Sequence, residues 1–232
     1  MKPESSRPSC FIVVCCSLCS VGRLSHAARL DQRFPKDSIL SDEDSSIFLD
    51  PLLNEEQIGS VTVDVRLGYD FLVSVVTRKP YIELATQSGA SRRGVSSYFQ
   101  ETRREVGDRF VLYPDQVVLT TTLEYLSLPP NVYADVLSRS SYTRLGVHVN
   151  TMVQPGFKGC VPIELYNHGN NAIELVVGSR ICQMRFFKMA EDANYMNDAN
   201  MRKYYGDVRP AASRADQDKD LPVLESARQS LD

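Results

Sequence analysis

Hydrophobic and polar residues alternate along several short stretches in the middle of the chain. In the run from Gly159 to Asn167, aliphatic residues recur at every second position. A strand places such residues on one face, here Val161, Ile163 and Leu165. The opposite face then carries Pro162, Glu164 and Tyr166. Val61–Val65 alternates in the same way and predicts a second half-buried strand.

Turn-forming residues separate these runs from other segments of strand character. Those segments are Phe71–Thr77, Phe110–Pro130 with a turn at Pro114–Asp115, Ala172–Val177 and Arg180–Lys188. Many short strands with few helical periods predict an all-β barrel or jelly roll. The two cysteines in these strands, Cys160 and Cys182, are expected to be small core residues.

Three segments fall outside the strand pattern. Ser41–Asp44 has the residues of a helix start, and Ala190–Lys203 is expected to form a second helix. Lys79–Asp108 is polar and is expected to leave the barrel as a solvated loop or helix face, because Glu101 and Glu105 are interspersed with its arginines.

The length predicts one folded domain with terminal extensions. The chain has 232 residues, which suffices for a real hydrophobic core. We expect the domain to span residues 37–208, followed by a mobile polar tail at 209–232. The net charge of −3 excludes a basic footprint for a nucleic-acid polymer, so any phosphate binding must be local.

Residues 1–36 resemble a leader more than part of a domain. Lys2 and Arg7 precede an apolar run, Cys10–Val21, that is too short to span a membrane. The segment is either a secretory signal or sequence upstream of the true start codon. We favour the second, with the protein in the cytoplasm, and a secreted or organellar location stays open.

A polar cluster interrupts the strand pattern between Ser138 and Asn167. Arg139, Ser140, Ser141 and Arg144 offer cationic forks and hydroxyl donors, which suit phosphate oxygens. Glu164 lies midway along an apolar strand, where it must be solvated in a cleft or paired. The cluster is either a nucleotide site with a poised carboxylate or a polar turn with surface ion pairs.

These segments resemble a known family. SRSSYTRLG followed by QPGFKGCVPIELYN closely resembles the dCTP deaminases of the dUTPase-like superfamily. VTVDVRLG, GSRICQMRFF and RKYYGD occur in the family's order as well. The likeness extends roughly from Ile39 to Asp220.

The resemblance implies a fold, an assembly and a reaction. The fold would be a dUTPase-like distorted β-barrel with a few short helices, assembled as a homotrimer with active sites at subunit contacts. The reaction would be dCTP + H₂O → dUTP + NH₃, which supplies dUTP for dTTP synthesis. Mg²⁺ would be bound to the triphosphate, and dTTP is a possible feedback ligand.

The resemblance also assigns roles to individual residues. Glu164 would deprotonate the attacking water and protonate the leaving amine, with a pKa lifted towards neutrality by a partly desolvated cleft. Ser140 would orient the water, and Arg144 would fix Glu164 or neutralise nearby charge. The implied nucleotide-binding residues are Arg139, Ser140, Ser141, Arg144, Asn150, Thr151, Gln154, Pro162, Ile163, Tyr195 and Lys203.

Two positions depart from the family pattern. Gln154 stands where many members and the dUTPases carry Asp. In dUTPases that Asp activates the water that attacks phosphorus, and a neutral amide cannot act as a base at pH 7. Asp207 stands where a glutamine is expected after Lys203, and its charge is unfavourable beside a triphosphate.

Zinc is not expected. The H-x-E and P-C-x-x-C patterns of zinc deaminases do not occur, and Cys16 and Cys19 have no second ligand pair at zinc spacing. His148 alternates with apolar residues and is expected to be an interior hydrogen-bonded group. His168 is expected to be a turn residue.

Two alternative functions remain open at this point. The chain could be a dUTP pyrophosphatase, or a bifunctional enzyme that carries dCTP to dUMP, although Gln154 argues against both. It could also be a non-catalytic nucleotide-binding homologue, although the carboxylate at Glu164 is retained.

Overall fold

The structure is a computed structural model that describes residues 12–14, 47–53, 55–77, 82, 84, 95–193, 207–217 and 220–229. Its strands are β1 (Ile12–Val14), β2 (Ile47–Asp50), β3 (Val63–Arg66), β4 (Asp70–Ser74), β5 (Phe99–Arg103), β6 (Arg109–Leu112), β7 (Val117–Ser127), β8 (Val132–Ser138), β9 (Val147–His148), β10 (Asn150–Val153), β11 (Lys158–Asn167), β12 (Ile173–Val176) and β13 (Arg180–Lys188). Its helical segments are η1 (Glu55–Gln57), η2 (Val95–Tyr98), α3 (Ser140–Thr143), η4 (Ala215–Gln217) and α4 (Asp220–Gln229).

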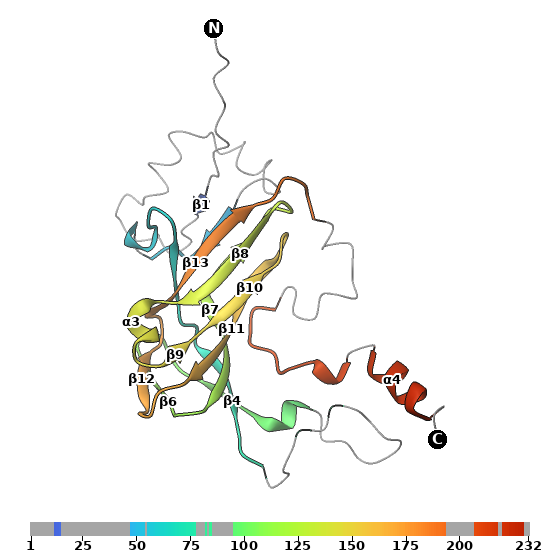
Figure 1. Cartoon of the computed structure of the whole chain (residues 1–232). Helices are drawn as coiled ribbons and strands as arrows, with labels where there is room; N and C mark the ends of the chain where they lie inside the picture. Colours follow the sequence, from blue (N-terminus) through green and yellow to red (C-terminus); the bar gives the residue numbers. More distant parts are fainter. Residues whose placement is uncertain are drawn as a thin grey trace.

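The described strands form two main sheets and a small ribbon (Figure 1). The larger sheet has the order β1-β2-β7-β11-β9, and β4 pairs with both β7 and β5. The second sheet has the order β10-β8-β13-β3, and Figure 1 shows β10, β8 and β13 side by side. The strands β12 and β6 pair with each other.

One hydrophobic core fills the space between the sheets. The inward residues of β11, Val161, Ile163 and Leu165, are essentially inaccessible to solvent. Phe71 and Phe110 stack in this core with ring centroids 4.3 Å apart. Burying each such side chain stabilises the fold by about 1.5–3 kcal/mol. The packing fixes β11 in place, so its alternate residues, including Glu164, face outward.

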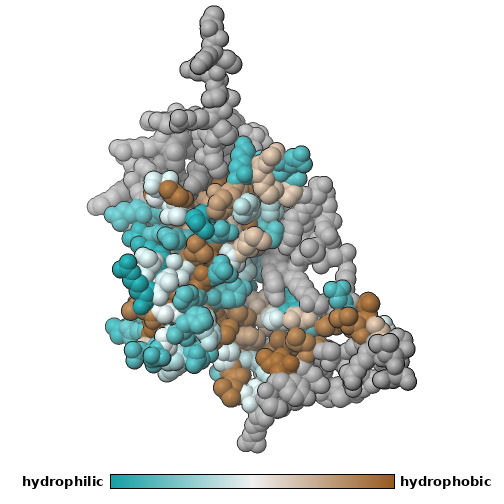
Figure 2. All heavy atoms as spheres, in the orientation of Figure 1, coloured by the Kyte–Doolittle hydropathy of each residue, from teal (hydrophilic) through white to brown (hydrophobic). Residues whose placement is uncertain are grey.

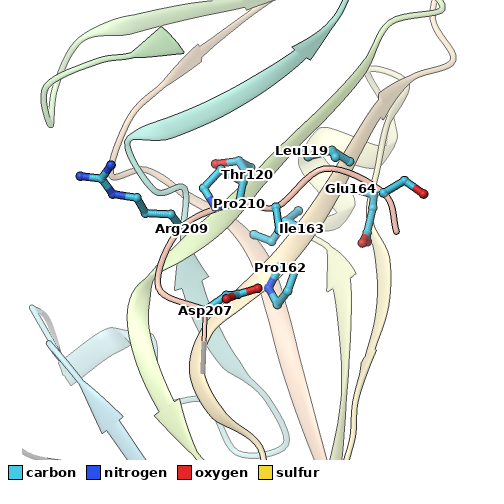
Figure 3. A pocket seen from close by; sticks show the side chains of 10 residues that line it. Leu119, Thr120, Pro162, Ile163, Glu164, Asp207, Arg209 and Pro210 are labelled. Atoms are coloured by element: carbon cyan, nitrogen blue, oxygen red, sulfur yellow. The ribbon is translucent and has the colours of Figure 1, made fainter. Parts of the chain in front are cut away.

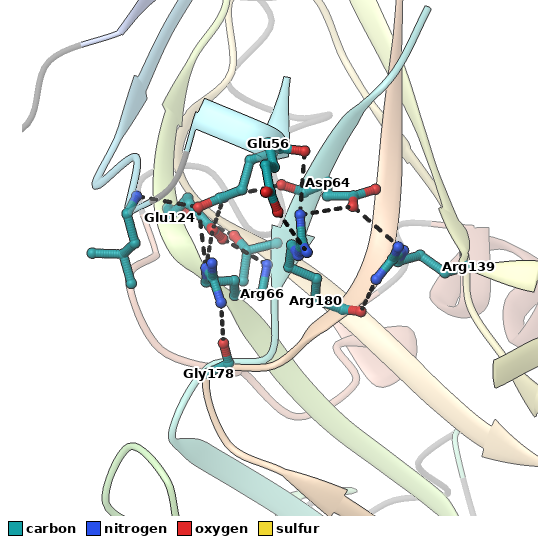
Figure 4. Close-up of polar contacts among 10 residues, drawn as sticks. Glu56, Asp64, Arg66, Glu124, Arg139, Gly178 and Arg180 are labelled. Atoms are coloured by element: carbon teal, nitrogen blue, oxygen red, sulfur yellow. Dashed lines mark hydrogen bonds and ion pairs between the residues drawn. The ribbon is translucent and has the colours of Figure 1, made fainter. Parts of the chain in front are cut away.

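A buried polar network lies in the same barrel (Figure 4). The Glu124 side chain on β7 is fully buried and accepts hydrogen bonds from Gln57 Nε2 at 3.0 Å and the Arg66 main-chain N–H at 2.9 Å. Arg66 also donates from Nε to Gln57 Oε1 and from Nη1 to the Gly178 carbonyl. The network ties η1 and β3 to β7.

The all-β prediction is confirmed. The alternating run at Gly159 lies in β11, and the predicted strands after Phe71, Phe110, Ala172 and Arg180 correspond to β4, β6 with β7, β12 and β13. Val63 and Val65 are buried in β3 as expected, whereas Val61 precedes the strand and is exposed. Asp115 occupies the predicted turn with a φ of 58°. Cys182 is buried and Cys160 is partly buried.

The polar excursion prediction was wrong for part of its length. Residues Phe99–Arg103 form β5, which pairs antiparallel with β4. Only edge strands tolerate so polar a sequence, because one face is solvated and nothing buries the other completely. Periodicity alone therefore did not identify β5. Arg92 and Arg93 lie outside the described residues.

The two helix predictions are not confirmed by the described residues. The predicted helix start, Ser41–Asp44, lies outside the described residues, and the residues from Ile47 onward form β2. Residues 190–193 are not helical, and the rest of the second predicted helix also lies outside. The helices α3 and α4 were not predicted from the sequence.

Both ends of the chain contribute described elements. Residues 12–14, in the expected leader, pair in parallel with β2 as β1. At the other end, hydrophobic side chains gather over the C-terminal segment, where Val208, Val223 and Leu224 are exposed (Figure 2). The domain bounds and the mobility of the tail stay predictions. Among the described residues, no helix is long and apolar enough to cross a membrane.

Candidate active site

Glu164 lies on the outward face of β11 and is held by a residue of the other sheet. Its side chain is exposed, and its Oε2 accepts a hydrogen bond from Thr151 Oγ1 on β10 at 2.6 Å. Thr151 is one of the predicted nucleotide-binding residues, and its hydrogen bond to Glu164 was not predicted from the sequence. One carboxylate oxygen is thereby fixed, while Oε1 is left for another partner.

A pocket of about 200 Å³ opens beside Glu164 (Figure 3). Leu119 and Thr120 of β7 line it together with Pro162, Ile163 and Glu164 of β11. The remaining wall comes from the C-terminal segment, through Asp207, Arg209, Pro210, Ala211 and Ser213. Two of the predicted nucleotide-binding residues, Pro162 and Ile163, therefore share a pocket with the predicted catalytic carboxylate.

Several contacts hold the C-terminal segment over the pocket. The Cys160 N–H donates to the Asp207 carbonyl at 3.2 Å, and Arg209 Nε lies 3.5 Å from Asp70 Oδ2. A Cβ at Gly159 would approach the Asp207 oxygen to 2.8 Å, so glycine permits this close crossing. Asp70 is almost fully buried, and its charge is compensated by Arg209 and, at 3.8 Å, by Arg103.

Asp207 has a role that the sequence did not reveal. Its Oδ2 lies 3.6 Å from Arg214 Nη2, within the same C-terminal segment. The arginine offsets part of the charge that made Asp207 unfavourable beside a triphosphate. Neither Asp70 nor Arg209 was singled out from the sequence, because their contact joins positions far apart in the chain.

The residues predicted to bind phosphate lie on α3 or directly beside it. Arg139 precedes the helix in an extended conformation, and its carbonyl accepts hydrogen bonds from the Tyr142 and Thr143 N–H groups. Ser140, Ser141 and Arg144 are exposed on the helix or directly after it. Their hydroxyl and guanidinium groups are thus accessible to an anion.

Within one chain, the described residues of the predicted phosphate site do not contact Glu164. The helix α3 packs on β9, and β9 pairs with β11 at Tyr166 and Asn167. Glu164 lies two residues before Tyr166 on β11, which is a distance of about 7 Å along the strand. Within the described part of the chain, no ion pair or hydrogen bond connects Arg144 or Ser140 with Glu164.

The remaining predicted residues are divided between described and undescribed parts of the chain. Asn150 is exposed on β10, and Gln154 is half-buried in the turn before Phe157, whose N–H donates to the Gln154 carbonyl at 3.2 Å. Neither residue lines the pocket. Tyr195 and Lys203 lie outside the described residues.

Of the two histidines in the described part of the chain, His148 differs from expectation and His168 does not. His148 is exposed on β9 rather than interior, because only the alternate residue Val147 faces the core. Its ring contacts that of His168, with centroids 4.7 Å apart. His168 follows β11 directly, as expected of a turn residue. Within the described ranges, no three His, Cys, Asp or Glu residues are grouped so as to hold a metal ion.

The chain is thus an all-β protein with an outward carboxylate, Glu164, beside a pocket. The family model described as dCTP deaminase-like matches residues 34–189. This chain therefore belongs to the dCTP deaminase-like family, which confirms the resemblance seen in its motifs.

Curated relatives cover most of this chain. The "dCTP deaminase, dUMP-forming" of Methanobrevibacter smithii is 36% identical over 184 residues, which are 77% of this chain and 92% of the relative. That of Methanosphaera stadtmanae is 33% identical over 196 residues, 79% and 97% of the two chains. The "dCTP deaminase" of Natronomonas pharaonis is 34% identical over 195 residues, again 79% and 97%.

Solved structures are more distant. The 2'-deoxycytidine 5'-triphosphate deaminase of Agrobacterium tumefaciens matches with a TM-score of 0.46 and 20% identity. This match covers 65% of the present chain and 45% of the other, so the chain spans less than half of that structure's length.

Proposed function

We propose that this chain is a hydrolase that deaminates dCTP, with Glu164 as the group that moves the protons. The observation that carries the proposal is an outward carboxylate on a rigid strand, fixed by Thr151 and bordering a pocket, in a chain of this family. This pocket, of about 200 Å³, is the space that we propose for the cytosine base.

The proposed reaction needs one base that becomes an acid. Glu164 takes a proton from water while the water oxygen bonds to C4 of cytosine, and the carboxyl gives this proton to N3, so that C4 becomes tetrahedral with hydroxyl and amino groups. The carboxylate then takes the hydroxyl proton and passes it to the amino nitrogen, the bond from C4 to that nitrogen breaks, and ammonia leaves as the C4 carbonyl of uracil forms. Since Thr151 occupies Oε2, Oε1 is the oxygen available to the water.

The triphosphate would bind at α3. Arg139, Ser140, Ser141 and Arg144 would hold its oxygens, with Mg²⁺ carried on the nucleotide as part of the substrate. Asn150, Thr151, Gln154, Pro162 and Ile163 would contact base and sugar, and Tyr195 and Lys203 are further candidates for binding the nucleotide. The sequence pattern supports these assignments, and the exposure of α3 is compatible with them.

A homotrimer would complete the site. Because α3 and Glu164 are not in contact within one chain, the α3 of one subunit would face the Glu164 of its neighbour. The exposed Val208, Val223 and Leu224 would be buried at such a contact. The protein would act in the cytoplasm, where dCTP is available, and dTTP would compete for the same phosphate site as a feedback ligand.

The immediate product would be dUTP, destined for dTTP synthesis. Gln154 supports this choice, because its amide cannot activate a water for attack on phosphorus. Release of dUMP is the second candidate, favoured by the names of the Methanobrevibacter and Methanosphaera relatives, both of which are described as dUMP-forming.

One assay separates these outcomes. Purified protein is incubated with dCTP and Mg²⁺, and ammonia, dUTP, dUMP and pyrophosphate are quantified. Equal amounts of ammonia and dUTP without pyrophosphate support the proposal. Pyrophosphate in equal amount to ammonia establishes the dUMP-forming alternative. Binding of dCTP without any product over hours means that the chain is a non-catalytic homologue.

A further inference from the structure

Arg139 differs from the other residues of the predicted phosphate site because its side chain is already held in place. Its Nη1 donates to the Arg180 carbonyl at 3.1 Å, and its Nε lies 3.4 Å from Asp64 Oδ2 (Figure 4). Its own N–H donates to the Ile181 carbonyl at 2.8 Å. Main chain and side chain are thus both attached to neighbouring strands.

Asp64 is the acceptor shared by two arginines. Its side chain is 15% exposed, and the same Oδ2 lies 3.7 Å from Arg180 Nη1. Arg180 is itself tied to η1, because its Nη1 donates to the Glu56 carbonyl at 3.2 Å and its Nη2 lies 3.7 Å from Glu56 Oε2. The Asp64 carboxylate therefore lies between two cations, and together with Glu56 the cluster balances two negative charges against two positive ones.

The buried network fixes the position of Asp64. Gln57 Nε2 donates to the Asp64 carbonyl at 3.1 Å and to Glu124 Oε1 at 3.0 Å. The neighbouring side chains on β3, Val63 and Val65, are in the hydrophobic core. Asp64 is therefore a fixed point at the surface of the barrel, next to the start of α3.

The geometry leaves the Nη2 group of the Arg139 guanidinium for a ligand. A guanidinium presents five N–H donors in a rigid plane. The interactions made by the described residues use Nε and Nη1, and none of them uses Nη2. An arginine held in this way loses little side-chain entropy when it binds an anion.

We propose that Asp64 is a positioning residue for phosphate binding: it orients Arg139 so that the Nη2 group of the guanidinium meets an oxygen of the triphosphate. This inference rests on the proposed function only in taking Arg139 as a phosphate contact. It predicts that Asp64 affects affinity for the phosphate chain and not the chemical step.

The test compares the affinities for dCTP and dCMP, which share base and sugar but differ in phosphates. Calorimetry measures both dissociation constants for the wild type, Asp64→Asn and Arg139→Gln. The matched control is Asp135→Asn, which removes another Asp–Arg pair of the same sheet, with Arg185 Nη2 at 3.2 Å from Asp135 Oδ2. Asp64→Glu provides a second variant that keeps the charge, should Asp64→Asn fold poorly.

The expected result is a selective loss for the triphosphate. Asp64→Asn weakens dCTP binding about tenfold, the order expected for a hydrogen bond to a charged group, and changes dCMP binding by less than about twofold. Asp64→Glu gives a smaller change in the same direction, and Asp135→Asn changes neither. If the enzyme turns over, KM for dCTP rises while kcat stays within about twofold of wild type.

Two results would overturn the inference. Equal losses for dCTP and dCMP in both Asp64 variants would mean that Asp64 serves only the fold. Unchanged dCTP binding by Arg139→Gln would mean that Arg139 does not contact phosphate. Absence of ammonia release by the wild type would instead contradict the proposed function, and the binding measurements would still decide the role of Asp64.

Discussion

Thr151 and Glu164 connect the two sheets of the barrel through one short hydrogen bond. The hydroxyl of Thr151, on the edge strand of the four-stranded sheet, donates to Oε2 of Glu164, on β11 of the larger sheet, at 2.6 Å. A flexible glutamate on an exposed strand face has several rotamers, and this bond selects one of them. The orientation of Glu164 therefore depends on how the two sheets sit against each other.

Removal of this hydroxyl should impair turnover without affecting the fold. Thr151→Val keeps the shape of the side chain and leaves Oε2 without its donor. Because hydrogen bonds to charged groups contribute about 1.5–3 kcal/mol, we expect kcat/KM for dCTP to fall about 10- to 100-fold. Thr151→Ser should restore most of the activity. Wild-type activity in Thr151→Val would mean that the bond has no part in catalysis.

The buried Glu124 predicts an unusual dependence of stability on pH. Burial raises its pKa from 4.5 to about 7, although the Arg66 N–H and Gln57 act in the opposite direction. The folded protein thus keeps a proton that the unfolded chain releases above pH 4.5. The contribution of Glu124 to the free energy of unfolding should therefore fall by about 3 kcal/mol between pH 4.5 and 7.

Thermal unfolding of Glu124→Gln at several pH values isolates this contribution. Glutamine does not titrate, so the Tm of the wild type relative to the variant should decrease as pH rises from 5 to 8. Glu174→Gln, which changes a half-exposed carboxylate on β12, should leave the pH dependence unaltered. A constant difference in Tm between wild type and Glu124→Gln would contradict a proton held at Glu124.

Arg209 should hold the C-terminal segment against the barrel. It is 61% exposed, so loss of its ion pair with Asp70 should cost only about 0.2–1 kcal/mol. In Arg209→Gln we expect the Cys160 amide, which donates to the Asp207 carbonyl, to exchange with deuterium about two- to fivefold faster. Arg185→Gln, which breaks the pair with Asp135, is the control. Identical exchange of Cys160 in all three proteins would show that Arg209 does not hold the segment.

The sequence predicted those parts of the fold that depend on local pattern. Strand β11 was predictable because its aliphatic residues alternate and the core buries all three of them. Strand β5 was not, since Phe99–Arg103 is a polar edge strand whose pairing with β4 is set by tertiary contacts. The helix α4 was not predictable either, because the polar C-terminal sequence shows no strong amphipathic period.

The candidate site was likewise only partly predictable from the sequence. Motifs around Arg139, Ser140 and Glu164 identified candidate residues, since a family's polar residues can be read in order along the chain. The contacts of Thr151, Asp64 and Arg209 could not be read in this way, because each joins strands or segments that only the folded barrel brings together. Within the described part of the chain, no contact joins Arg144 and Glu164.

The most direct measurement compares ammonia release from dCTP by the wild type and by Glu164→Gln, with dCTP affinity measured on both. The amide keeps the size of the side chain but cannot take a proton from water. We predict at least a 10³-fold lower rate for the variant, on the order of the contribution of general acid–base catalysis, with dCTP affinity within about threefold of wild type. Ammonia release by Glu164→Gln at the wild-type rate would contradict the account.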